Sequence, residues 1–489
     1  MPRTFVTADY EATLNRTIRL GDALPPTHLA RFIVAAIAQL DLSGLYARYG
    51  KRGGTALAPE LLLGVLFYGY ATGVFSSRKL EQATYESIPF RFLAGEHHPD
   101  HDTIAQFRKA FLPELKDLFV QLLLCARLAG VLTLGNVSVD GTKIHADASK
   151  SQAVSYKHLL ALEHRLQAEV EALFALGEQA DQVGDQPATA PGGGSGLPVE
   201  SGLPAELARR QERLANLAQA KAVLEERAQA RYATERTEYD AKMQAREARA
   251  RQTNRQPGGR PPQPPTPGPR DKDQYNFTDP DSRIMKNSTN AGFEQHYNAQ
   301  VAVEQTSALI VAPALSNSPT DQGQALPTVD AIPPELGRPP AAALDNGYWS
   351  PPTIAGLIAR GIDPYIATGR DPHHQPWHTY FAEPPAPPPA TASLQVQMAY
   401  RLQTEIGQAI YRLRKCTVEP VIGIIKEVLG FRQFSLRGVA AAAGEWCLVC
   451  LAFNLKRLHV LCQGQPLVAI VPAGPALSAA PGDISPTDC

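Results

Sequence analysis

The chain has 489 residues, of which 44% are hydrophobic and 19% charged, and its formal net charge is −1. This length allows two or more domains with a sizeable core. The near-zero net charge excludes a polycation that binds nucleic acid through its overall charge, so any DNA binding must come from local basic patches.

Cysteine usage and hydropathy indicate a cytosolic protein. The six cysteines form no disulfide framework. Cys447 and Cys450 make a CxxC pair, but they lie in an apolar helical segment without a second pair, which favours core packing over metal binding. The N-terminal residues have no apolar signal core. Residues 61–77 are uncharged but short for a membrane span, and we expect a buried core helix there.

Residues 1–132 are predicted to be a helical, DNA-binding domain. Apolar residues recur at helical spacing across residues 29–40 and 59–70. Short helices with turns and basic residues favour a helix-turn-helix-like unit, and a generic helical domain is the alternative. The basic residues expected at the DNA are these: Arg78, Lys79, Arg108 and Lys109.

Histidines gather in two stretches of the chain. His97, His98 and His101 have no evident fourth ligand beside them, so we expect a solvated loop rather than a metal site. Asp102 is expected to cap a helix over residues 103–111. A second group is expected at the surface of a loop: His373, His374 and His378.

The segment over residues 131–150 contains the first candidate catalytic acid. Residues 137–139 predict a short buried strand that ends at Asp140, before Gly141. An acid at such a strand end is how a two-metal nuclease places a carboxylate. An Asp-Gly turn is the alternative.

Residues 151–270 are predicted to interrupt this domain. Leucines at heptad-like spacing predict helices over residues 155–176 and 205–252, joined by a Gly/Pro/Ser-rich link. A proline-rich linker follows at residues 256–270. Six arginines against one glutamate over residues 246–270 indicate either a phosphate-contacting run or a solvated tail.

The chain then returns to strands. A hairpin is predicted from residues 296–303 and 308–313. A strand of small apolar residues over 341–344 ends at a second acid, Asp345. Further elements are expected as a helix over residues 351–360, a strand over 364–368 and an apolar helix over 439–459.

The third acid, Glu419, lies in a basic stretch. Val421, Ile424, Ile425 and Val428 have the spacing of a helix with one buried face. Pro420 suits the first turn of that helix, with Glu419 at its start and Lys426 about two turns further on the same face. Taken alone, this is either a surface helix with ordinary ion pairs or a metal-binding acid beside a phosphate-holding surface.

Three blocks of the chain resemble bacterial insertion-sequence transposases of the DDE type, whose C-terminal signature is Tyr-x2-Arg-x3-Glu-x6-Lys. Glu419 and Lys426 keep the Glu–Lys spacing. Arg412 and Lys415 stand where Tyr and Arg are expected, and Tyr411 and Arg414 lie one position earlier. VDGTK, ending at residue 143, resembles the first catalytic block, and DPDSRIMK over residues 279–286 resembles the segment before the second strand.

The resemblance, over most of residues 25–460, implies an α/β fold. A ribonuclease-H-like catalytic domain would span residues 133–462, with residues 151–270 as a helical-hairpin insertion. It would follow the all-α domain and precede a disordered tail over residues 463–489. In such a fold the first strand is central, the fourth lies beside it, and a later helix crosses their ends. That arrangement would bring three acids together: Asp140, Asp345 and Glu419.

The same resemblance implies an activity. The three acids would be catalytic and would bind two Mg²⁺ ions, with Mn²⁺ as a substitute. Water would free a 3′-hydroxyl at the end of the element, and that hydroxyl would attack target DNA. The partners would be terminal inverted repeats, target DNA and further copies of the chain, in a homodimer or larger assembly in the bacterial cytoplasm. DNA contacts are expected from six residues: Lys426, Arg412, Arg414, Lys415, Arg78 and Lys79.

Two other classes of protein remain open. One is a catalytically inactive repressor derived from a transposase, against which the intact acids argue. The other is an all-helical scaffold protein built around the hairpin, against which the strand-ending aspartates argue.

Overall fold

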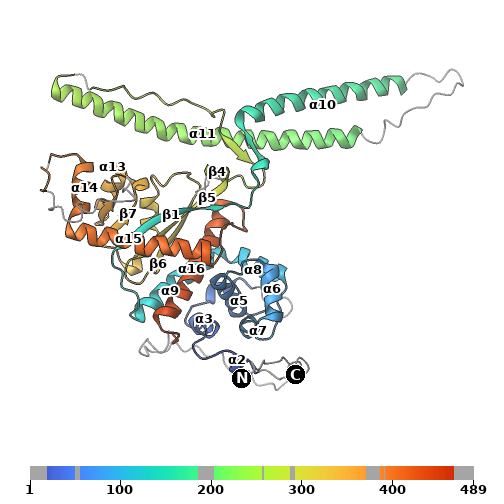
Figure 1. Ribbon diagram of the computed structural model, residues 1–489. Coiled ribbons are helices and arrows are strands. Elements are labelled where there is room, and N and C mark those ends of the chain that lie inside the picture. The colour runs from blue at the N-terminus through green and yellow to red at the C-terminus, as the bar shows by residue number, and fades with distance from the viewer. Residues whose placement is uncertain are drawn as a thin grey trace, which may run out of the picture. The chain divides into compact units, whose positions relative to one another are not determined.

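The computed structural model describes residues 19–49, 56–184, 203–255, 258–286, 292–369, 386–389 and 391–466. The chain divides into two compact units, Met1–Asp147 with Met285–Cys489, and Ala148–Ile284 (Figure 1). The predictions for His373, His374 and His378, for the link over residues 185–202 and for the tail from residue 467 lie outside the described residues.

The N-terminal part of the first unit is helical. Its α5 helix is buried along most of its length, as predicted for a core helix. Asp100, rather than Asp102, caps α8, because its side chain accepts the N–H of Thr103 at 2.7 Å and the helix begins two residues earlier than predicted. The helices are α2 (Leu20–Ala23), α3 (Leu29–Ile37), α4 (Ser43–Ala47), α5 (Pro59–Thr72), α6 (Ser77–Glu86), α7 (Ile88–Leu93), α8 (His101–Ala110) and α9 (Leu112–Leu128).

A mixed sheet follows the helical region. The strands are β1 (Val137–His145), β4 (Arg283–Lys286), β5 (Phe293–Glu304), β6 (Ile310–Ser316), β7 (Ala341–Leu344) and β8 (Asp363–Ile366). Their order is β4-β5-β1-β7-β8, and β6 also pairs with β5. β1 is antiparallel to β5 and parallel to β7, which is parallel to β8. The prediction that the first strand is central and lies beside the strand of Asp345 is confirmed, and an all-helical scaffold is excluded.

Helix α16 (Val439–Leu461) joins the helical region to the sheet, because it contacts α3, α5 and α9 as well as β6. Of the described residues, only this helix is long and apolar enough to cross a membrane, but 67% of that apolar window is buried inside the protein. Cys447 and Cys450 are buried in it, and burial raises the pKa of both thiols. The expectation that they pack in the core is therefore confirmed.

A polar network lies within this apolar core. Glu445 of α16 is fully buried and accepts the hydroxyl hydrogen of Tyr70 at 3.1 Å. Arg108 donates to the same hydroxyl at 3.0 Å and to the carbonyl of Phe75. Arg108 is therefore part of the core, and its predicted role at the DNA is wrong. The network fixes α16 to α5 and α8 because buried polar groups left without partners are costly.

The remaining helices surround the sheet: α12 (Ala325–Asp330), α13 (Pro351–Ala359), α14 (Leu394–Gln403) and α15 (Glu405–Gly423). The Thr404 side chain caps α15 by accepting the N–H of Gly407. The prediction that Glu419 starts a helix and that Pro420 lies in its first turn is wrong, because Thr404 supplies the real start. Pro420 lies inside the helix, where it lacks an N–H, and a π-helical turn over Ile424–Val428 follows.

The second unit is a helical hairpin on a small sheet. Helices α10 (Tyr156–Gly184) and α11 (Leu203–Thr253) pack together, as predicted, and β2 (Ala153–Ser155) pairs antiparallel with β3 (Gln274–Asn276). The unit has its own hydrophobic core, whose buried leucines are Leu159, Leu166, Leu217 and Leu224.

Candidate active site

Asp140 and Asp345 occupy matching positions on two neighbouring parallel strands. β1 and β7 are paired in parallel as far as Val139 and Leu344, so an aspartate comes next on each strand. β1 itself continues to His145, and the prediction that it ends at Asp140 is wrong. Only its pairing with β7 ends there, because the chain turns after Leu344 into the 3₁₀ turn Asn346–Tyr348. The two carboxylates are thereby placed at one edge of the strand pair.

Arg414 of α15 links the first acid to the third. Its Nη1 lies 2.9 Å from Asp140 Oδ2, and its Nη2 lies 3.0 Å from Glu419 Oε1. The Arg414 side chain is 11% exposed and that of Asp140 18%, whereas that of Glu419 is 45% exposed. The structure therefore brings the three predicted acids into one cluster, with Glu419 on its open side.

The buried aspartates are poorly placed to carry negative charge. Burial raises the pKa of Asp140 to about 6; Arg414 opposes that rise, and the charges of Asp345 and Asp321 add to it. Burial also raises the pKa of Asp345. Carboxylates crowded in this way gain from a nearby cation. Because all the donors are carboxylate oxygens, the residues fit a hard divalent ion such as Mg²⁺ or Mn²⁺.

A fourth acid, Asp321, belongs to this cluster and was missed by sequence reasoning. Its Oδ1 accepts the side-chain amides of Asn298 and Gln300, each at 2.9 Å. Gln300 pairs with Gly141 across β1 and β5. A Cβ at position 141 would collide with the Gln300 amide and lie 2.8 Å from Asp321 Oδ1, which explains the glycine after Asp140.

Only one signal in the sequence pointed toward Asp321. Asn298 and Gln300 are two residues apart in a buried strand, where apolar side chains are the rule. Two polar side chains on one face of such a strand require partners. Asp321 itself lies in a loop between β6 and α12, where no local pattern marks it.

Lys426 lies beside the strand that carries Asp140. Its Nζ donates to Thr142 Oγ1 at 3.1 Å and to the carbonyl of Lys143 at 3.5 Å. Thr142 is two residues after Asp140, on the same face of β1. Lys426 is in the π-helical turn, so the helix from Glu419 to Lys426 is not the two regular α-helical turns that the sequence predicts. Burial and the neighbouring Arg432 lower the pKa of its ammonium group.

The other predicted DNA contacts lie at the surface, except Arg414 in the cluster. Arg412 and Lys415 are exposed on α15. Arg78 and Lys79 are exposed on α6. Tyr411, which is out of register with the family signature, lies with its ring centre 6.0 Å from the Arg414 guanidinium.

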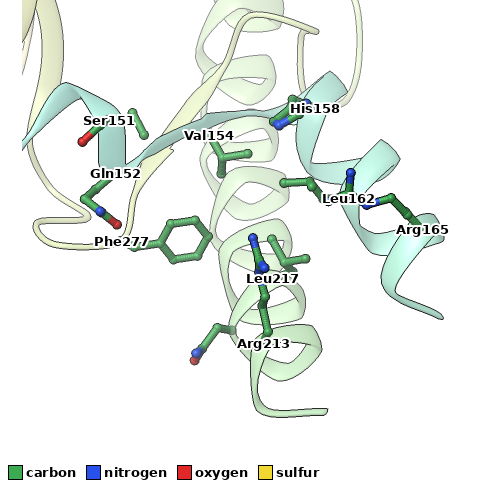
Figure 2. A pocket seen from close by; sticks show the side chains of 11 residues that line it. Ser151, Gln152, Val154, His158, Leu162, Arg165, Arg213, Leu217 and Phe277 are labelled. Carbon is green, nitrogen blue, oxygen red and sulfur yellow. The ribbon is translucent and has the colours of Figure 1, made fainter. Parts of the chain in front are cut away.

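The second unit contains a separate cavity of about 580 Å³. Figure 2 shows Phe277, His158 of α10 and Arg213 of α11 among the side chains that line it. None of the described residues that line this cavity is acidic. It is therefore unsuited to the chemistry of the acidic cluster.

Two segments of the chain match family models. Residues 18–110 match a transposase domain (DUF772), and residues 388–459, which include Arg414, Glu419 and Lys426, match a transposase DDE domain. No curated protein and no solved structure matches the chain. The two segments are thus similar to a transposase domain and to the DDE domain of transposases, a class of enzyme that cleaves and joins DNA and generally uses divalent metals.

Proposed function

We propose that this protein is a transposase of the DDE family, which cleaves DNA at the ends of its insertion sequence and joins the 3′-hydroxyl ends to target DNA. The observation that carries the proposal is the acidic cluster itself. Asp140 and Asp345 follow the last residue pair of two parallel strands, and Arg414 connects Asp140 to Glu419. The strand order supports a ribonuclease-H-like domain over residues 133–462, with residues 151–270 inserted and the helical DNA-binding region over residues 1–132.

We propose that Asp140, Asp345 and Glu419 hold two Mg²⁺ ions, with Mn²⁺ as a substitute. Two such ions activate the attacking oxygen and stabilise the leaving oxygen of a phosphodiester. The chain supplies the positions of the carboxylates, two of which are fixed by strands and therefore need little reorganisation. In the absence of cations, Arg414 reduces the repulsion between Asp140 and Glu419.

The basic residues around the cluster are proposed to position DNA. Arg414 can present its planar guanidinium to a phosphate once its two carboxylates bind metal. Lys426 lies along β1 beyond Asp140 and can hold the phosphate next to the scissile one as a point charge. Arg412, Lys415, Arg78 and Lys79 are exposed and would contact the backbone further from the reaction. A homodimer or larger assembly is proposed for the DNA complex.

Replacing Lys426 by alanine is expected to lower Mg²⁺-dependent nicking of an end-containing duplex about tenfold or more, equivalent to ~1.4 kcal/mol of transition-state stabilisation. End binding should change little, because the residue is one cation among many. Nicking assays and gel shifts on the same preparations measure the two effects. Lys116→Ala, which removes an exposed lysine of α9, is the control. Unchanged nicking by the Lys426→Ala protein would show that Lys426 does not position the DNA for cleavage.

Replacing both Arg78 and Lys79 by alanine is expected to weaken binding to the element's end. Each phosphate contact contributes about 0.9 to the slope of log K against log salt, so the slope should fall by about two. The measurement is a gel shift over a range of salt concentrations. The full chain is used because α5 and α9 of the N-terminal region pack against α16 near the other end of the chain. Arg91→Ala, on the neighbouring α7, is the control. An unchanged slope would show that Arg78 and Lys79 do not contact phosphates of the element's end.

A further inference from the structure

A second group of metal-binding side chains lies on β1 and β5. His145 and His296 are directly opposite each other in the antiparallel pair, with ring centres 4.3 Å apart. Glu294 is two residues before His296, and its Oε2 lies 3.0 Å from His145 Nδ1. One ligand atom from each of the three residues lies within 4.8 Å of the other two. We propose that His145, Glu294 and His296 bind a transition-metal cation of the Zn²⁺ type.

The orientation of His296 supports this assignment. Its Nδ1 lies 2.9 Å from the carbonyl oxygen of Glu294. A proton on Nδ1 donates to that carbonyl, which leaves Nε2 with the lone pair that a metal needs. Proteins commonly fix the tautomer of a metal-binding histidine in this way. The His296 side chain is thus already prepared to act as a ligand.

The backbone of His145 is held by hydrogen bonds on both sides. His145 pairs with β5 on one side, and on the other its N–H donates to the Arg432 carbonyl at 3.0 Å. Its carbonyl also accepts the N–H of Phe434 at 2.8 Å. Ligands on paired strands hold their geometry better than ligands on loops. His296 is 2% exposed, whereas His145 and Glu294 are partly exposed, so a cation can enter from solvent.

This group is separate from the acidic cluster. His145 is five residues beyond Asp140 on β1, a distance of about 16 Å at 3.3 Å per residue. It also points to the other face of the strand, because side chains alternate. Two imidazoles and one carboxylate suit zinc and leave a fourth position for water, whereas Mg²⁺ prefers oxygen ligands alone. Ligand atoms around tetrahedral zinc lie about 3.3 Å apart. The ligand atoms of His145, Glu294 and His296 lie within 4.8 Å of one another, so small side-chain rotations would bring them to that spacing.

A bound cation would join the two central strands where β5 begins. It would replace the contact between His145 and Glu294 with one bond from each residue to the metal. Because metal ligands must be deprotonated, the affinity for the cation would depend on pH. Binding to the folded state alone stabilises that state. The proposed role is therefore structural: the cation would hold β1 and β5 together, whereas the acidic cluster would carry out the reaction.

The experiment measures zinc bound to the full chain, purified without a histidine tag, equilibrated with Zn²⁺ and freed of loose metal by gel filtration. Elemental analysis should find about one zinc per wild-type chain, and the His145→Ala and His296→Ala variants should lose it. Co²⁺ in place of zinc should give the visible bands of a four-coordinate site in the wild type and not in the two variants.

Three further variants make the result specific. Asp345→Asn, which alters the acidic cluster, should retain the zinc, and so should His164→Ala, which removes an exposed histidine of α10. Glu294→Gln keeps the size of the side chain and should weaken zinc binding about tenfold or more. Equal zinc in the wild type and in both His145→Ala and His296→Ala, or loss of zinc in Asp345→Asn, would overturn the proposal.

Discussion

The Asp345→Asn protein is expected to lose Mg²⁺-dependent cleavage by about 10³-fold or more, which corresponds to ~4 kcal/mol of transition-state stabilisation. The carboxylate lies beside Asp140 at the edge of β1 and β7, and an amide cannot replace its charge at a divalent cation. Asp140→Asn and Glu419→Gln should behave alike. Binding to the element's end should survive, because no basic residue is changed.

The measurement is nicking of an end-containing duplex in Mg²⁺, beside a gel shift on the same protein. Asp102→Asn, which alters an acid of α8 that is 79% exposed, is the matched control and should cleave normally. Full cleavage by Asp345→Asn would reject that residue as a ligand. A wild-type protein that binds ends tightly in Mg²⁺ but never nicks them would instead indicate the repressor.

Asp140→Asn should also make the metal-free protein more stable at pH 8. In the folded wild type the pKa of Asp140 is about 6, above the ordinary value of 3.8, so its ionisation opposes folding as pH rises from about 4 to 6. A shift of about two units corresponds to at most about 3 kcal/mol, and the lost contact with Arg414 reduces the gain. The advantage of the variant should be complete above about pH 6 and absent below about pH 4.

Thermal unfolding in EDTA at pH 4 and at pH 8 tests this, with a rise of a few degrees expected at pH 8. Asp330→Asn is a control for which the change in stability at pH 8 should have the opposite sign. A hydrogen bond from Arg360 lowers the pKa of Asp330, so its replacement should destabilise the protein at pH 8. If Asp140→Asn is less stable than the wild type at pH 8 in EDTA, the buried charge is not unfavourable.

The elements that could be predicted from the sequence are those marked by local pattern. β7 over Ala341–Leu344 is as predicted, and the apolar spacing predicts α16 and α11 to within two residues at each end. It predicts α10 as well, but that helix continues eight residues beyond the predicted end. Asp140 and Asp345 can be predicted because each follows a short segment with the pattern of a buried strand, although β1 continues past Asp140. The spacing between Glu419 and Lys426 predicts Glu419 as the third acid, although the helix around it begins at Glu405.

What could not be predicted depends on contacts between distant residues. Asp321 joins the cluster only because β5 brings Asn298 and Gln300 beside a loop. Proline is common in the first turn of a helix, so Pro420 predicts a helix start, but the cap at Thr404 and the packing of α15 on β1 outweigh that preference. The group His145, Glu294 and His296 depends on the register of β1 with β5, which no single segment encodes.

The network of Tyr70, Arg108 and Glu445 has a consequence for shortened forms of this protein. The helices that match the N-terminal transposase domain share one core with a helix near the other end of the chain, so they do not form an exchangeable module. A reading frame interrupted before residue 439 would leave α5 and α9 without their apolar partner and Arg108 without its carboxylate. Such a shortened product is expected to aggregate or be degraded rather than persist as a dominant-negative competitor for the element's ends.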